Sequence, residues 1–243
     1  MTVDLPPANA LDAAASRQLT HHFTEFRDNP SLRVAILTGA GERFFCAGWD
    51  LNSAAGGEGF EADFGAGGFG GFPELRGLRK PVICAVNGMA VGGGFEMVLA
   101  AHLVVAADHA EFFLPETHRG IIPDAASIRL PRLLPRALAL ETLLGIRRFT
   151  AAELADWGLV NRVVPGPEVV AETRRLAASV VESAPLAVEA VLEAMEAGEG
   201  RPVDEGLARL REGESYRRMV ASDDAAEGPR AFAERRPPLW EGR

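Results

Sequence analysis

Apolar residues in the first part of the chain recur at two different spacings. From Asn9 to Asp28 they fall three or four positions apart, which predicts an amphipathic helix. Directly afterwards, residues 33–39 (RVAILTG) form a short β-branched run that ends at a glycine, as expected of a strand. Residues 81–88 (PVICAVNG) form an uninterrupted apolar run, which is typical of a strand buried on both faces. Helices and strands therefore alternate, and the pattern predicts an α/β domain.

The later pattern changes from mixed to mainly helical. After Gly94, a short helical segment (FEMVLAAH) precedes strand-like segments at 103–107 and 111–116. From Pro123 onward nearly every segment predicts a helix, the clearest being 168–182, 185–198, 203–220 and one that starts near Ser222, while only 159–164 reads as a strand. The opening strand-like segment TVDL has no partner in this pattern. We therefore expect a core domain over 1–165 and a helical region over 166–243.

Residues 54–72 hold eight glycines and predict a long surface loop. Within this segment, GAGGFG at 65–70 matches the dinucleotide pattern GxGxxG. That pattern needs a preceding buried strand and a following helix, so we interpret the match as accidental. The single lysine, Lys80, does not follow a glycine loop, and triphosphate chemistry has no support.

Composition and charge restrict the remaining functions. Of the 243 residues, 47% are hydrophobic and the net charge is −9, so the chain can bury a full core, and nucleic acid is not an expected partner. Cys46 and Cys84 lie in apolar runs without CxxC spacing, and the five histidines show no ligand spacing, so we expect neither a disulfide framework nor a metal site. No apolar stretch reaches about 18 residues, and the N-terminus lacks a signal-peptide pattern. These features predict a cytoplasmic protein without a membrane partner.

Two glycine turns are candidates for binding a polarised oxygen. Gly92, Gly93 and Gly94 stand between a buried strand and a helix, and FFCAGWDL at 44–51 follows the strand at 33–38 in the same way. Either turn alone is equally well explained as a tight connection. Two such turns from neighbouring strands, however, can supply two converging N–H donors, which is the geometry of an oxyanion hole.

Two carboxylates lie beside these turns in apolar surroundings. They are Glu96, in GGGFEMVLAA, and Glu116, in EFFLPE. Each is either at a solvated edge or buried with a raised pKa. A helix, a turn and a strand can bring them to the same level, and paired carboxyls near an oxyanion hole suit proton transfer at a carbon next to a carbonyl. Cys46 has no neighbouring histidine and is interpreted as a core residue.

The chain resembles the crotonase, or enoyl-CoA hydratase, superfamily along essentially its whole length. The resemblance is carried by ANALD at 8–12, RVAILTGAGERFFCAGWDL at 33–51, KPVICAVNGMAVGGGFEMVLAA at 80–101, FFLPETHRGIIPD at 112–124, WGLVNRVVP at 157–165, APLAV at 184–188 and EGPRAFAERRPPLWEGR at 227–243. AGWDL, the glycine-rich loop and IIPD are most similar to the carnitinyl-CoA dehydratase branch, whose members hydrate crotonobetainyl-CoA.

This resemblance implies a spiral core of ββα turns, with a C-terminal helical region that forms trimers, often paired into hexamers. It implies that the backbone amides of Trp49 and Gly93 hold the thioester carbonyl of an acyl-CoA. By the same analogy, Glu96 orients or deprotonates the water added at Cβ, and Glu116 exchanges the proton at Cα. No cofactor is implied beyond the CoA of the substrate. The positions implied to contact the substrate are Ala47, Asp50, Leu51 and Asp124.

The chain also departs from the family pattern. The turn after Pro123 is one residue shorter than usual, and Asp124 occupies the position whose amide helps to hold the water in relatives. The sequence therefore leaves three readings open. The first is an acyl-CoA hydratase or dehydratase, the second is an isomerase that uses one glutamate, and the third is a CoA-ester binding protein without catalysis.

Overall fold

The computed structural model describes residues 1–243, which form two compact units. The first unit comprises residues 1–78 and 82–176, and the second comprises residues 79–81 and 177–243. The boundary between them lies inside helix α7 (Val169–Val181). The division after residue 165 falls before this helix and stays a prediction.

Five strands of the first unit form a parallel sheet in the order β1-β2-β4-β6-β9. Their bounds are Thr2–Val3 for β1, Ala35–Gly39 for β2, Val82–Val86 for β4, Leu103–Ala107 for β6 and Arg162–Val164 for β9. Every residue of β4 is buried, as the continuous apolar run predicted. The opening strand β1 pairs with β2 through Thr2 and Thr38, so the expectation that it has no partner is wrong. The backbone groups along the edge of β2 that does not face β4 form the hydrogen bonds with β1.

A second sheet contains four very short strands in the order β3-β5-β7-β8. They are β3 (Phe44–Cys46), β5 (Met89–Val91), β7 (Glu111–Phe113) and β8 (Phe149–Thr150). The first three are parallel, and β8 is antiparallel to β7. Each of β2, β4 and β6 thus leads into a strand of the second sheet and then into a helix. This repeated ββα path confirms the α/β class, although the sequence pattern missed β3, β5 and β8.

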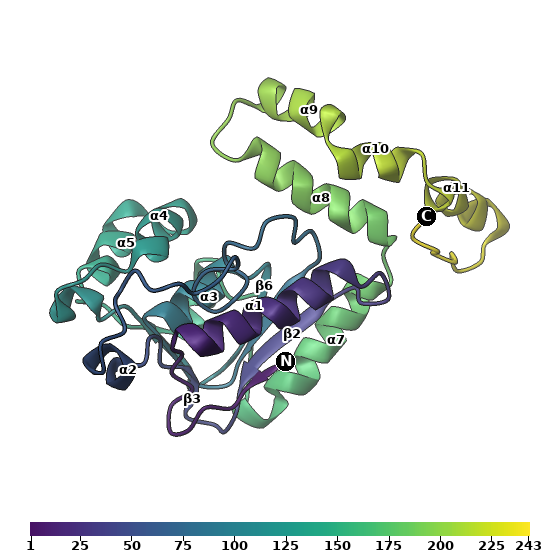
Figure 1. The fold of residues 1–243 in the computed structure, drawn as a ribbon. Coiled ribbons are helices and arrows are strands. Elements are labelled where there is room, and N and C mark those ends of the chain that lie inside the picture. The colour runs from purple at the N-terminus through teal and green to yellow at the C-terminus, as the bar shows by residue number, and fades with distance from the viewer. The chain divides into compact units, whose positions relative to one another are not determined.

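Helices cover the sheets of the first unit. They are α1 (Ala13–Asp28), α2 (Leu51–Ala55), α3 (Gly93–Ala100), α4 (Asp124–Leu133), α5 (Arg136–Leu143) and α6 (Ala151–Asp156), with 3₁₀ helices η1 (Glu116–Arg119) and η2 (Gly166–Glu168). Helix α1 lies along the five-stranded sheet in Figure 1, and its Phe23 and Phe26 are buried in the main core. It begins where the side chain of Asp12 accepts a hydrogen bond from the amide of Ala15, at 2.7 Å.

The end of the glycine-rich segment is packed into the protein rather than exposed as a surface loop. Gly70, Gly71 and Phe72 are buried. A Cβ atom added to Gly70 would lie 2.5 Å from Cγ of Met97, and one added to Gly71 would lie 2.5 Å from Cβ of Leu19. These glycines allow the end of the segment to lie close against α1 and α3. The expected surface loop is therefore confirmed for residues 56–66, which are exposed or half-buried, and is wrong for the end of the segment.

The second unit is mainly helical. Its helices are α8 (Pro185–Gly198), α9 (Val203–Glu212), α10 (Glu214–Val220) and α11 (Asp223–Glu234), and α8 packs along α9 and α10 (Figure 1). The helix expected over 203–220 breaks at Gly213, where the carboxylate of Glu193 accepts a hydrogen bond from the amide of Ser215 and so caps α10. Ser222 caps α11, as predicted. None of the helices in the chain is long and apolar enough to cross a lipid bilayer.

Candidate functional site

Three of the residues expected in the site follow three adjacent parallel strands. Trp49 comes after β3, Gly93 after β5 and Glu116 after β7. The carboxyl ends of parallel strands meet at one edge of a sheet, which is where α/β proteins place their ligands. The second sheet thus brings together residues that are far apart in the sequence. The turns leave β3 and β5, not the strands at 33–38 and 81–88 from which they were expected to leave.

The turns at Trp49 and Gly93 are in close contact. Gly48 has a φ of +85°, and a Cβ atom there would lie 2.7 Å from the carbonyl oxygen of Val91 and 3.1 Å from the nitrogen of Gly93. A glycine is therefore required for the two turns to approach each other. Neither the Trp49 nor the Gly93 amide donates a hydrogen bond within the chain. Two unpaired N–H donors thus lie close together, and one of them opens helix α3.

Glu96 lies in the first turn of α3 and is 9% exposed. Its carboxylate accepts a hydrogen bond of 2.8 Å from the amide of Ala126. Burial raises the pKa of Glu96 to about 7, and the nearby charges of Asp124 and Glu116 act in the same direction. The amide hydrogen bond opposes this shift but does not cancel it. Glu96 can therefore gain or lose a proton near neutral pH.

Glu116 opens the 3₁₀ helix η1 and is also 9% exposed. Strand β7 ends at Phe113, so Glu116 is not in the strand that the sequence suggested. Its carboxyl lies against Gly92, where an added Cβ would come within 2.5 Å of Oε1. The other oxygen, Oε2, is buried without a hydrogen-bond partner. Burial raises the pKa of Glu116 to about 7, with Arg119 opposing and Asp124 adding to the shift.

A cavity of about 530 Å³ connects these groups. It is lined by Gly93 and by the aromatic rings of Trp49, Phe60, Phe64 and Phe69. Six acidic residues also line it, namely Glu61, Asp63, Glu74, Glu96, Glu116 and Asp124. No arginine, lysine or histidine is among its lining residues. This first cavity is therefore both aromatic and acidic, a combination that attracts cations.

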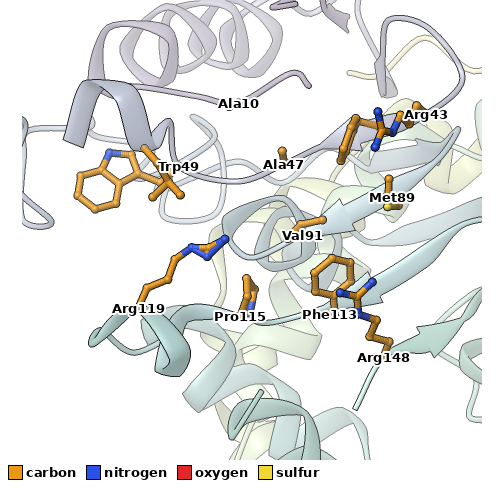
Figure 2. Close-up of a pocket in the computed structure, with 12 residues that line it drawn as sticks. Ala10, Arg43, Ala47, Trp49, Met89, Val91, Phe113, Pro115, Arg119 and Arg148 are labelled. Atoms are coloured by element: carbon orange, nitrogen blue, oxygen red, sulfur yellow. The ribbon is translucent and has the colours of Figure 1, made fainter. Parts of the chain in front are cut away.

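A second cavity, of about 480 Å³, has the opposite charge character. Its lining includes Arg43, Arg119 and Arg148. Figure 2 shows Trp49 and Arg119 on one side of it and the other two arginines on the opposite side. The guanidinium of Arg148 lies over the ring of Phe113, 4.0 Å from its centroid. Sequence reasoning missed all three arginines. Arg43 and Arg119 lie within segments that carry the family resemblance, but the three are far apart in the chain and no local pattern relates them to one another.

The expected substrate-binding positions fall at different places. Ala47 and Leu51 line the second cavity, and Asp124 lines the first. Asp50 lines neither, since its side chain caps α2 by accepting a hydrogen bond from the amide of Asn52. Trp49 is the one residue that lines both cavities.

Two other features define the chemistry of this region. Burial raises the pKa of the Cys46 thiol to about 12, which leaves it protonated and unsuited to nucleophilic attack at neutral pH. The chain contains no group of three or more histidine, cysteine, aspartate or glutamate side chains arranged to hold a metal ion. The chemistry available from the residues themselves is thus proton transfer beside two N–H donors.

Several known proteins are similar to this chain in sequence and in fold. Carnitinyl-CoA dehydratase from Proteus mirabilis is 52% identical over 99% of this chain and 94% of its own length, and the protein of the same name from Citrobacter koseri is 52% identical over 100% and 94%. The crystal structure of enoyl-CoA hydratase from Mycobacterium tuberculosis matches with a TM-score of 0.90 and 37% identity, over 100% of this chain and 94% of that one. Residues 1–243 also match the sequence model of the family described as enoyl-CoA hydratase/isomerase. The chain therefore belongs to the enoyl-CoA hydratase/isomerase family, and its α/β fold is the crotonase fold.

Proposed function

We propose that this protein is an acyl-CoA hydro-lyase that adds or removes water across the Cα–Cβ bond of an enoyl-CoA thioester, with crotonobetainyl-CoA and carnitinyl-CoA as its substrate pair. The observation that carries the proposal is the pair Glu96 and Glu116, both buried at one cavity, both with a pKa raised to about 7, beside two unpaired amides. The names of the relatives from Proteus and Citrobacter support the same substrate.

The amides of Trp49 and Gly93 would hold the thioester carbonyl oxygen. Negative charge accumulates on this oxygen when the oxygen of water adds to Cβ in hydration, and when a proton leaves Cα in dehydration. Donors that are already in place stabilise that charge without reorganisation, typically by about 3 to 4 kcal/mol for each donor. The N-terminus of α3, to which Gly93 belongs, adds the positive end of a helix dipole.

The two glutamates would carry the proton transfers. In the hydration direction, ionised Glu96 takes a proton from water as the new O–Cβ bond forms, and protonated Glu116 gives its proton to Cα. The proton on Glu96 then returns to Glu116 through solvent, so that one water is consumed and both carboxyls are restored. In the dehydration direction the same steps run in reverse. A pKa near 7 keeps both protonation states accessible at neutral pH.

The second cavity suits the CoA end of the substrate. Its three arginines, Arg43, Arg119 and Arg148, can pair with phosphate oxygens, which guanidinium groups bind in a bidentate manner. Ala47 and Leu51 supply apolar surface in the same cavity. CoA would thus bind on one side of Trp49 and the acyl group on the other. The reaction needs no cofactor other than the CoA that the substrate carries.

The first cavity suits the acyl end. Crotonobetaine carries a trimethylammonium group whose positive charge is permanent. Aromatic faces attract quaternary ammonium ions, and carboxylates compensate their charge. The four rings and six acidic residues of the first cavity, with no basic residue among them, favour this acyl group over a neutral fatty chain. Asp124 is the carboxylate we assign to the cation, since its side chain is exposed and has no part in the proton transfers described above.

We infer a homotrimer, or two trimers paired into a hexamer, because apolar side chains such as Val191 and Met195 on α8 are 57% and 69% exposed in the single chain. Cys46 and Cys84 are free thiols, which suits a reducing cytoplasm.

Loss of the enone absorbance of crotonobetainyl-CoA on mixing with the protein tests this function. We expect hydration of crotonobetainyl-CoA at a higher kcat/KM than that of crotonyl-CoA. The matched control is the double variant Glu96→Gln/Glu116→Gln, which keeps the shape of the site. Tight binding of both thioesters without loss of absorbance would contradict the proposal in favour of a binding protein, and migration of the double bond without hydration would favour an isomerase.

A further inference from the structure

Trp49 has two separate tasks in this molecule. Its amide is one of the two donors proposed for the thioester oxygen, and Trp49 is the one residue that lines both cavities. A substrate that spans both cavities must therefore pass this ring. Because Trp49 contributes to the walls of both cavities, a group that fixes its ring can influence how substrate binds in each.

The backbone of Trp49 is attached to the segment just before α1. The amide of Leu11 donates to the carbonyl of Gly48 at 2.8 Å, and the amide of Asp50 donates to the carbonyl of Leu11 at 2.9 Å. Together these two bonds form a parallel bridge between Leu11 and Trp49. Leu11 is fully buried, so the bridge fixes the turn to the core.

The indole is attached to the same segment through Glu58. The Nε1–H of Trp49 donates to Oε1 of Glu58 at 2.7 Å. The amide of Ala13, the first residue of α1, donates to both carboxylate oxygens of Glu58, at 3.2 and 3.1 Å. One carboxylate thus joins the ring to the start of a helix, where an N–H group has no intrahelical acceptor and negative charge is favoured.

We propose that Glu58 is a positioning residue that holds the indole of Trp49 as the partition between the two cavities. Its bond to Ala13 and the bridge at Leu11 fix the side chain and the backbone of Trp49 to one rigid segment, so the partition keeps a constant position relative to the amide donor. This role rests on the proposed function for its kinetic consequence, but the anchoring of the ring does not depend on that function. Two residues after Glu58, the ring of Phe60 packs edge-on against the ring of Trp49, with 6.1 Å between the ring centroids.

The anchoring is tested in the absence of substrate. Trp157 and Trp240 are replaced by phenylalanine, which leaves Trp49 as the single tryptophan. In this background, Glu58→Ala should raise the quenching of indole fluorescence by acrylamide by at least about twofold, because the ring loses a hydrogen bond to a charged acceptor. Glu58→Gln, which retains one carbonyl acceptor, should return the quenching most of the way to the parent value. Glu25→Ala, which removes a carboxylate from the exposed face of α1, is the matched control and should change nothing.

The kinetic consequence is measured with full-length protein that retains all three tryptophans. Glu58→Ala should lower kcat/KM for crotonobetainyl-CoA by at least about tenfold, mainly through a higher KM, and Glu58→Gln should stay within about threefold of the parent. Unchanged quenching in Glu58→Ala would overturn the anchoring itself. Increased quenching with unchanged kcat/KM in an active enzyme would overturn the positioning role. If the parent protein hydrates no enoyl-CoA, the proposed function fails while the quenching still decides whether Glu58 anchors the ring.

Discussion

The carboxylate of Glu96 accepts a hydrogen bond of 2.8 Å from the backbone amide of Ala126, thirty residues further along the chain. Ala126 lies in the first turn of α4, so its amide is one of those that a helix leaves without an internal acceptor. Glu96 is itself in the first turn of α3. The carboxylate is thus held between the N-terminal turns of two helices, and a glutamine at this position can accept the same bond.

Replacing either glutamate by glutamine should nearly abolish turnover while leaving binding intact. Glu96→Gln and Glu116→Gln should each lower kcat for hydration by at least about 10², the lower range for a general acid or base. Glutamine keeps the shape of the side chain and removes its proton chemistry. The measurement is the rate of absorbance loss of crotonobetainyl-CoA, with thioester affinity determined by calorimetry on the same samples. Near parental turnover in either variant would remove that glutamate from the mechanism.

The same substitutions should stabilise the protein at alkaline pH. Folding raises the pKa of each carboxyl from 4.5 to about 7, so the folded state binds its proton more tightly than the unfolded state does. This proton binding stabilises the folded state fully below pH 4.5, and the stabilisation is lost as the pH rises through about 7. At pH 8, Glu96→Gln or Glu116→Gln should therefore raise the free energy of unfolding by up to about 3 kcal/mol.

Urea unfolding at pH 4 and pH 8 checks this difference. The gain should vanish at pH 4, where the parent glutamates are protonated in the folded protein and already uncharged. Glu25→Gln, an exposed position on α1, serves as the control and should show no such pH dependence. A gain of equal size at both pH values would show that packing, rather than the buried charge, is responsible.

Asp124→Asn should discriminate between cationic and neutral acyl groups. The carboxylate of Asp124 lines the acidic cavity and accepts a hydrogen bond from the amide of its neighbour Ala125, at 2.7 Å, which asparagine can also accept. The variant should lower kcat/KM for crotonobetainyl-CoA more than for crotonyl-CoA, by roughly 1 kcal/mol or more, as expected for a partly desolvated charge contact. Steady-state kinetics with both substrates measure the difference. Equal losses on both would mean that Asp124 serves the water or the helix, not the cation.

Removing the charge of Asp124 should also move the pH profile. Its charge contributes to the raised pKa of Glu96 and of Glu116. Asp124→Asn should therefore shift the acidic limb of the kcat/KM profile to lower pH. An unshifted limb would mean that this charge does not reach the two glutamates.

The assembly should contain three chains or six. Val191 and Met195 on α8, and Phe232 on α11, which is 88% exposed, leave apolar surface uncovered in the single chain. Light scattering at micromolar concentration should give the mass of a trimer or of a hexamer, and Val191→Asp/Met195→Asp should shift it towards smaller species. A stable monomer of the parent protein under these conditions would overturn the inference.

Local patterns in the sequence were sufficient to predict many of the elements and the chemistry of the site residues. The helix at α8 and the strand at β6 have the bounds that their periodicity indicated, and Ser222 caps α11 as its position before two aspartates suggested. Gly93 and Glu96 lie within one short motif, so the placement of a donor and a carboxylate at the start of a helix could be predicted without the fold. Such features depend on neighbours within one or two turns of the chain.

The tertiary structure alone decided how these pieces meet. Strands β3 and β5 have three residues each, too few for a periodic signal, yet their parallel pairing brings the turns at Trp49 and Gly93 together. No local sequence pattern indicates the arginines of the second cavity or the anchor at Glu58, because their partners come from other elements. Burial and nearby charges, which raise the pKa of Glu96 and Glu116, depend on what packs around each carboxyl. A one-dimensional pattern specifies which groups are present, while the distances between distant segments set their environment and hence their reactivity.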